Sequence, residues 1–98
     1  MDKEIIITKR FRKNVMSVHS YLLKEFSEKT ALEFLSRLEK RIEFIALHHL
    51  TGKPSLKKDN VRSLLFTPHN QIFYRQKENK IEILCLFDMR KDPSKKPY

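Results

Sequence analysis

The sequence predicts an α+β fold in which two helices pack on one face of an antiparallel sheet. Three observations predict it: a β-branched run at residues 5–7, two long stretches with apolar residues at every third or fourth position, and three short apolar segments separated by turn-like sequences. A chain of 98 residues suits one domain built from two layers. We therefore expect a single domain over 1–98, in which residues 89–98 form a basic C-terminal tail.

The first two elements are a short N-terminal strand and a helix. Residues 5–7 favour a strand because β-branched side chains fit a pleated surface. Thr8 is a suitable helix cap, since its hydroxyl can accept a hydrogen bond from a free amide of the first turn. A single apolar stripe then follows at spacings of three and four residues: Phe11, Val15, Val18, Leu22 and Phe26.

A second amphipathic helix follows a very short link, with Ser27 as its cap. Because the link is short, the two helices should form an antiparallel hairpin. Gly52 and Pro54 are expected to end the second helix, and residues 51–60 to form a basic loop. The apolar stripe of this helix contains Ala31, Phe34, Leu35, Leu38, Ile42, Ile45 and His49.

Three strands complete the predicted order β–α–α–β–β–β. The segments at 61–66, 71–76 and 81–88 are joined by short turn-like sequences, which is typical of a three-stranded antiparallel meander. The last segment is apolar on both faces, which marks a central strand. Strict alternation would place Ile81, Ile83, Cys85 and Phe87 on one side and Leu84 and Leu86 on the other.

Charge is the strongest global signal in the chain. The formal net charge is +9, which attracts phosphate backbones or acidic proteins, although a merely solvated basic surface is the alternative. The single cysteine, Cys85, excludes an internal disulfide and lies in an apolar run typical of a buried, inert thiol. The chain has neither a signal-peptide core nor a run of about 20 apolar residues, so we expect a cytoplasmic protein without a membrane partner.

Basic side chains are the candidate contacts for an anionic partner. Arg62 alternates with Leu64 and Phe66, so it should project over a partly dry surface. There it could bind a phosphate or carboxylate, or form a structural ion pair with a residue such as Asp88. The lysines in loops could instead be simply solvated. The full set of candidate contacts is Lys53, Lys57, Lys58, Arg62, Arg75, Arg90 and Lys91.

The histidines do not predict a metal site. His48 and His49 are adjacent, so on a helix they point in different directions and cannot share a metal at the usual spacing of four. His69 lies in a turn, where it is either a plain turn residue or a general acid or base. The chain lacks Cys-x-x-Cys, His-Glu-x-x-His and glycine-rich phosphate loops, and we expect neither a metal nor a cofactor.

Several motifs occur in an order that resembles one known family. A short strand precedes a helical hairpin with the pattern AxxFLxxL at 31–38, then VRSL at 61–64, IFYR at 72–75 and ILCLFDMRKDP at 83–93. This order resembles the RelE/ParE family of toxins from bacterial toxin–antitoxin systems over nearly the whole chain. The resemblance implies a compact toxin neutralised by a partly disordered antitoxin that wraps around it. The net charge independently agrees with this resemblance, because a basic surface needs an acidic antitoxin or an anionic target.

The resemblance implies one of two activities. RelE-like members are ribosome-dependent endonucleases that cut messenger RNA, whereas ParE-like members inhibit DNA gyrase without acting as nucleases. Arg62 and Arg90 fall where the nuclease branch has cations. Leu64 stands where that branch has a lysine, and Gln71 where it has an arginine. Tyr98 resembles the C-terminal tyrosine of the nucleases, but its offset from Arg90 is longer.

We therefore predict a ParE-like toxin that binds DNA gyrase. The alternatives are an endonuclease that binds the ribosome with mRNA and uses Arg62 and Arg90, with Tyr98 or His69 in proton transfer, and a basic nucleic-acid-binding module or inactive toxin. A shared site requires Arg62 and Arg90 to meet on one open, concave side of the sheet. An acidic antitoxin could add a strand to a sheet edge or lay a helix beside the hairpin.

Overall fold

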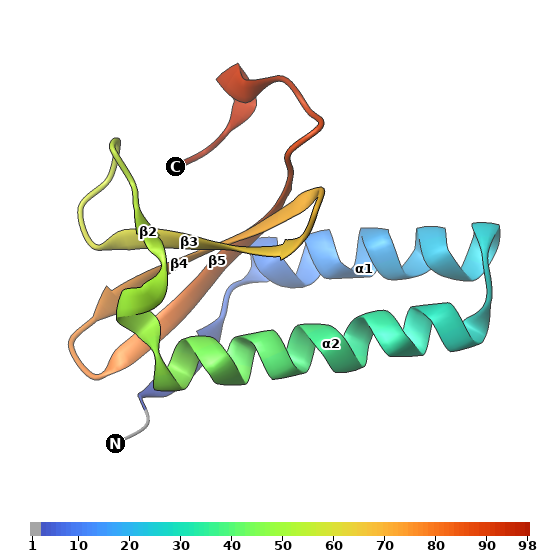
Figure 1. Cartoon of the computed structure of the whole chain (residues 1–98), viewed down its shortest axis with the longest axis horizontal. Helices are drawn as coiled ribbons and strands as arrows, with labels where there is room; N and C mark the ends of the chain where they lie inside the picture. Colours follow the sequence, from blue (N-terminus) through green and yellow to red (C-terminus); the bar gives the residue numbers. More distant parts are fainter. Residues whose placement is uncertain (1–2) are drawn as a thin grey trace.

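The computed structural model describes residues 3–98 and confirms the predicted α+β architecture (Figure 1). The predicted strand, helical hairpin and three-stranded meander all form, in that order. Two short 3₁₀ helices, η1 and η2, and one additional strand accompany them. In chain order the elements are β1 (Glu4–Ile7), α1 (Lys9–Glu25), α2 (Glu28–Leu47), η1 (His49–Thr51), β2 (Lys53–Pro54), β3 (Val61–Thr67), β4 (Asn70–Lys77), β5 (Lys80–Asp88) and η2 (Pro93–Lys95).

The strands form one sheet in the order β1-β5-β4-β3-β2. The three strands β3, β4 and β5 form the predicted antiparallel meander. The first strand, β1, pairs in parallel with β5, with Ile5 opposite Ile81. The short strand β2 was expected to be loop, but it pairs with β3 through Lys53 opposite Ser63. The backbone of the chain therefore extends the meander at both edges.

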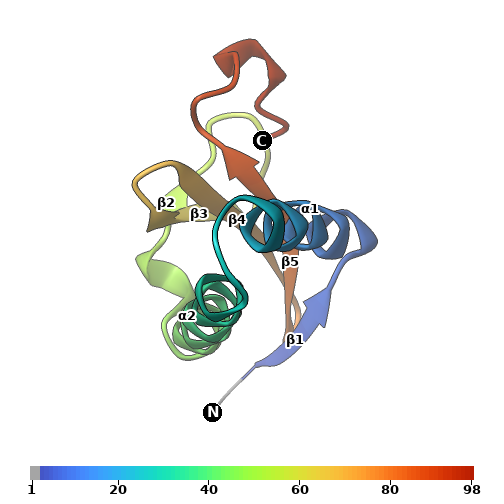
Figure 2. The same cartoon turned by 90° about the vertical axis from the view of Figure 1, so that its right-hand side faces the viewer.

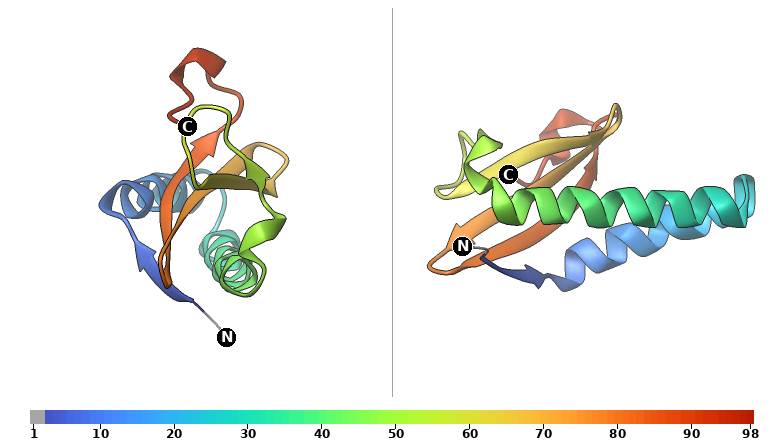
Figure 3. Two further views of the ribbon diagram at one scale, coloured as in Figure 1. Left: turned by 90° about the vertical axis from the view of Figure 1, so that its left-hand side faces the viewer. Right: turned by 60° about the horizontal axis from the view of Figure 1, so that its bottom comes forward.

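The two helices begin at the predicted caps and cover one face of the sheet (Figures 2 and 3). The Thr8 hydroxyl accepts a hydrogen bond from the amide of Phe11 at 3.1 Å, and it donates to the carbonyl oxygen of Ile83 at 2.8 Å. Ser27 caps α2 by accepting from the amide of Thr30 at 3.1 Å. Thr8 therefore both starts α1 and attaches it to β5. No helix among residues 3–98 is long and apolar enough to cross a membrane.

Each face of the sheet has its own apolar cluster. A β-bulge between β4 and β5 places Phe73 opposite Cys85 and Tyr74 opposite Ile83, so the strict alternation expected along β5 is broken. The cluster under the helices contains Phe11, Phe34, Leu38, Ile45, Phe66, Ile72, Tyr74, Ile81, Ile83 and Leu86. The cluster on the open face, which the helices do not cover, contains Val61, Phe73, Leu84 and Cys85, with Phe87 and Tyr98 packed against it.

The end of α2 differs from the expectation. The helix stops at Leu47, and residues 49–51 form the separate turn η1 before Gly52. Gly52 has an ordinary φ of −64°, so left-handed backbone does not explain it. A Cβ atom at this position would instead collide with the Tyr74 hydroxyl. The only glycine of the chain is therefore required for a close approach between η1 and β4.

Candidate functional site

Arg62 holds the segment that follows α2. It is half-buried in β3, and its Nη1 atom donates to the carbonyl oxygens of Gly52 at 2.8 Å and Leu50 at 3.3 Å. Burial lowers the pKa of His49 in the same segment, and the Lys3 and Arg62 cations lower it further. Arg62 was expected to bind an anionic partner or to form an ion pair with a residue such as Asp88. Neither expectation accounts for these bonds, because its partners are backbone carbonyls.

Arg90 pairs with the carboxylate that ends β5. Its Nε atom lies 3.0 Å from Asp88 Oδ1 and its Nη2 atom 2.9 Å from Oδ2, which makes a two-pronged ion pair. The hydrogen bonds from Arg90 are the main cause of the pKa of Asp88 falling to about 2. The guanidinium remains exposed, but its donors toward β5 are already occupied.

The strand register separates Arg62 from Arg90. Arg62 lies opposite Tyr74, whereas Arg90 follows Asp88, which lies opposite Asn70 at the other end of β4. In β3, Thr67 also lies opposite Asn70 and so marks the end near Arg90. Because a strand rises about 3.3 Å per residue, Arg62 and Thr67 are roughly 16 Å apart. The expectation that the two arginines meet in one site on one open side is therefore wrong.

Tyr98 lies on the open face, away from both arginines. The tail turns through η2 and returns over the sheet, where the Tyr98 ring packs on Phe73 with 5.6 Å between ring centroids. Lys96 Nζ lies 5.6 Å from the centre of the same Phe73 ring. The tail therefore brings Tyr98 beside lysines, but not beside Arg62 or Arg90.

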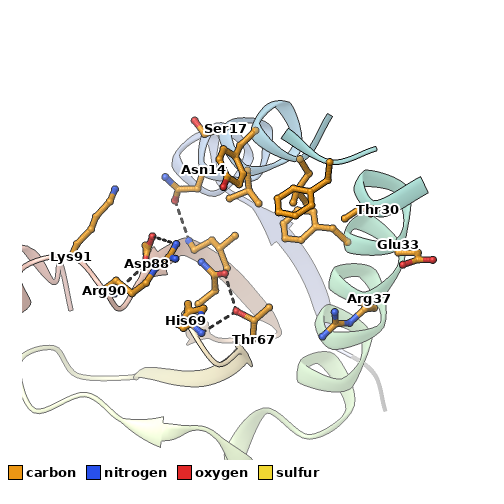
Figure 4. A pocket seen from close by; sticks show the side chains of 17 residues that line it. Asn14, Ser17, Thr30, Glu33, Arg37, Thr67, His69, Asp88, Arg90 and Lys91 are labelled. Atoms are coloured by element: carbon orange, nitrogen blue, oxygen red, sulfur yellow. Dashed lines mark hydrogen bonds and ion pairs between the residues drawn. The ribbon is translucent and has the colours of Figure 1, made fainter. Parts of the chain in front are cut away.

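The remaining predicted contacts are spread over the molecule. Arg75 pairs with Glu82 on the neighbouring strand, with 2.8 Å between Nε and Oε1, so it is partly neutralised. Lys53, Lys57 and Lys58 are exposed on and after β2. Lys91 is exposed beside Arg90 on the helix side of the sheet (Figure 4). The structure brings Lys53 and Lys57 together in one groove with Tyr98.

A groove of about 650 Å³ lies between the far end of the helical hairpin and the β3–β4 turn (Figure 4). We call it the hairpin groove. His69 and Arg90 line one wall and Arg37 of α2 lines another. Exposed aromatic side chains, Tyr21 and Phe26, contact each other edge to face at the hairpin end. The apolar lining of the hairpin groove consists of Val18, Tyr21, Leu22, Phe26, Phe34 and Leu86.

A second groove, of about 710 Å³, lies on the open face between the tail and residues 53–57. We call it the tail groove. The sequence identified Gln71 only as a departure from the nuclease pattern, yet this residue is buried in the groove and its Nε2 atom donates to Ser63 Oγ at 2.8 Å. Gln71 Oε1 has no donor among the described residues. A polar residue at the start of an apolar strand segment was the only sequence signal for it.

Among residues 3–98, the side chains form neither a metal site nor a reactive thiol. Burial raises the pKa of the Cys85 thiol to about 11, which suits an inert core residue. Within residues 3–98, no group of three or more histidine, cysteine or acidic side chains could hold a metal ion.

The fold and these surfaces define a small, basic α+β protein with one groove on the helix side of its sheet and another on the open face. A family described as "ParE toxin of type II toxin-antitoxin system, parDE" matches residues 5–93. The chain therefore belongs to the ParE toxin family, and it is a toxin of a type II toxin–antitoxin system.

Solved structures agree with the fold. The chain is similar to one from the chromosomal ParDE toxin–antitoxin system of P. aeruginosa, with a TM-score of 0.75 and 12% identity over 88% of this chain and 95% of the other. It is also similar to a chain of the E. coli DinJ–YafQ complex (0.64; 10% identity; 92% and 96%). A third similar structure is the S. aureus YoeB dimer (0.57; 14%; 87% and 94%). No curated protein matches the sequence.

Proposed function

We propose that this chain is a ParE-like toxin that stops growth by binding DNA gyrase and does not cut RNA. The observation that carries the proposal is where the two arginines expected of a nuclease lie and what they bind. Arg62 is bonded to backbone carbonyls, Arg90 to Asp88, and the register holds them apart. A transition-state phosphate needs several donors aimed at one point, and loss of one such donor commonly costs about a hundredfold in rate.

The two departures from the nuclease pattern support the same conclusion. Leu64 packs against the core cluster under the helices, and Gln71 is buried on the open face. Neither side chain can supply the positive charge that the nuclease branch has at these positions. A protein that works by binding its target needs a complementary surface and does not need these charges.

We further propose that an acidic antitoxin neutralises the toxin by laying an amphipathic helix in the hairpin groove. The groove offers the exposed rings of Tyr21 and Phe26 for apolar anchors. Arg90 offsets Asp88, and the remaining charged side chains that line the groove are Arg37, Lys91 and Glu33, so positive charge is in excess. An acidic helix would complement this rim and the net charge of +9. Such a toxin acts in the cytoplasm, where gyrase and ribosomes are.

Induced expression without an antitoxin tests the proposed target. We expect growth arrest with DNA-damage signalling and filamentous cells, while transcripts stay intact. Rapid loss of translation with cleaved transcripts would instead support the endonuclease, which the open face favours through Tyr98 and its neighbouring lysines. In that case Arg90→Ala should remain toxic, because Arg90 lies away from Tyr98 and is paired with Asp88. Normal growth at full expression would support a nucleic-acid-binding module or an inactive toxin.

A further inference from the structure

The C-terminal tail fills part of the tail groove. Besides the Tyr98 ring on Phe73, two hydrogen bonds hold it: Ser55 Oγ donates to the carbonyl oxygen of Tyr98 at 3.0 Å, and Lys57 Nζ donates to that of Lys96 at 3.2 Å. Both bonds are side chain to backbone. The groove therefore accepts an extended segment of backbone with an aromatic side chain, and here the chain itself provides that segment.

The tail leaves one polar group of the groove unsatisfied. Gln71 is 9% exposed and its amide nitrogen is bonded to Ser63, but its amide oxygen has no donor in the described part of the chain. Exchanging the amide oxygen and nitrogen would leave the same deficit, because the Ser63 hydroxyl can satisfy only one of them. Buried amides in folded proteins normally have partners for both atoms. The tail is thus an incomplete occupant of this groove.

The charge and apolar character of the groove indicate what a complete occupant would be. Lysines line it at positions 53, 57 and 96, and its lining contains no aspartate or glutamate. Leu56, Leu65 and Met89 are exposed around it. Without the tail, the lining has these three exposed aliphatic side chains and a single ring, Phe73. It therefore favours a peptide over single-stranded RNA, because RNA binding of this kind stacks successive bases on aromatic side chains. Peptide backbone also supplies both a donor and an acceptor, so it suits either orientation of the Gln71 amide.

We propose that the tail groove is a binding site for an acidic, extended peptide that carries an aromatic side chain, and that the tail competes for it in cis. The incoming aromatic ring replaces Tyr98 on Phe73, and a backbone group bonds to Gln71. Acidic side chains lie near Lys53 and Lys57. Identifying this peptide as a segment of the antitoxin rests on the proposed function, but the groove and its ligand class do not.

Fluorescence anisotropy with a short labelled peptide of glutamate, leucine and one tyrosine tests the site on the full chain. Tyr98→Ala removes the competing ring, so we expect the peptide to bind about tenfold more tightly. Adding Gln71→Leu to that variant should weaken binding about fivefold. Gln71→Met serves as a second variant if the leucine lowers the folded fraction. Leu47→Ala is the matched control, because it removes an exposed apolar side chain that lines neither groove, so it should leave peptide binding unchanged.

Unchanged peptide affinity in Tyr98→Ala, or no binding by that variant, would overturn the proposal. A larger gain for an oligouridylate of the same charge would also overturn it, in favour of RNA. These results are independent of the growth experiment. Peptide binding without growth arrest through gyrase would refute only the proposed function. Growth arrest through gyrase without peptide binding would refute only the tail groove site.

Discussion

Arg62 and Tyr74 lie opposite each other in the β3–β4 pair, and both side chains bind the segment that follows α2. The Tyr74 hydroxyl donates to the carbonyl oxygen of His49 at 2.5 Å and accepts from the amide of Gly52 at 3.0 Å. Arg62 donates to the carbonyl oxygen of the same glycine at 2.8 Å. The pair therefore attaches the helical hairpin to the meander, and this explains why a strand arginine is not free for catalysis.

Tyr74→Phe should lower the free energy of unfolding by about 1–3 kcal/mol, because it leaves the buried Gly52 amide without an acceptor. Urea unfolding followed by circular dichroism measures the change. Tyr98→Phe is the control, since the described contacts give the Tyr98 hydroxyl no hydrogen bond and its ring can keep its place on Phe73. Equal stability of Tyr74→Phe and the native chain would refute the attachment role.

Gly52→Ala should destabilise the chain by about 1–3 kcal/mol through overpacking. The added Cβ atom would meet the Tyr74 hydroxyl and lie 3.0 Å from Arg62 Cβ. Removing the hydroxyl relieves part of this clash, so Gly52→Ala should cost less in the Tyr74→Phe background than alone. A double-mutant cycle of unfolding free energies checks this coupling. Strictly additive changes in the unfolding free energy would show that positions 52 and 74 are not sterically coupled.

The Asp88 carboxyl should titrate near pH 2, instead of its usual 3.8, because Arg90 stabilises its charged form. In Arg90→Gln the midpoint should return toward 3.8, as NMR titration of the carboxyl carbon can show. Since the folded pKa is depressed, the pair contributes stability above about pH 3.8, and this contribution is lost as the pH falls toward 2. Arg62→Gln should leave the Asp88 midpoint where it is, because Arg62 lies at the other end of the strands. An equal shift in that control would contradict the separation of the two arginines.

Phe26→Ala should weaken binding of the acidic antitoxin about tenfold or more if its helix occupies the hairpin groove. Phe26 is 64% exposed in the free toxin, so its loss should hardly affect the fold. Isothermal titration calorimetry with the co-purified antitoxin measures the change. Leu47→Ala offers a matched control, since this side chain is 58% exposed at the other end of α2 and does not line the groove. Equal losses from both variants would place the antitoxin elsewhere.

The sequence was sufficient for the helical hairpin and the meander because local signals specify them. Thr8 and Ser27 cap the helices as predicted, and apolar spacing defined the buried faces except at Phe26, which is 64% exposed. The parallel pairing of β1 with β5 could not be predicted, since it joins residues that are distant in the chain. The bulge opposite Leu84 was hidden because both registers of β5 look equally apolar.

The candidate site was harder to predict because reach and direction decide it. The sequence identified Arg62, Arg90, His69 and Tyr98 as individual residues, but only the register shows that the two arginines lie at opposite ends of the strands. Alternation placed Arg62 on the apolar face but could not show that carbonyls near Gly52 would bind it. The role of Gln71 emerges only when the tail returns over it.

A supercoiling assay with purified gyrase and the purified chain tests the central claim most directly. The account predicts that the chain inhibits supercoiling by gyrase, that added antitoxin restores it, and that messenger RNA remains intact in a parallel reaction with ribosomes. Full supercoiling activity together with cleaved messenger RNA would contradict the account and establish the endonuclease instead.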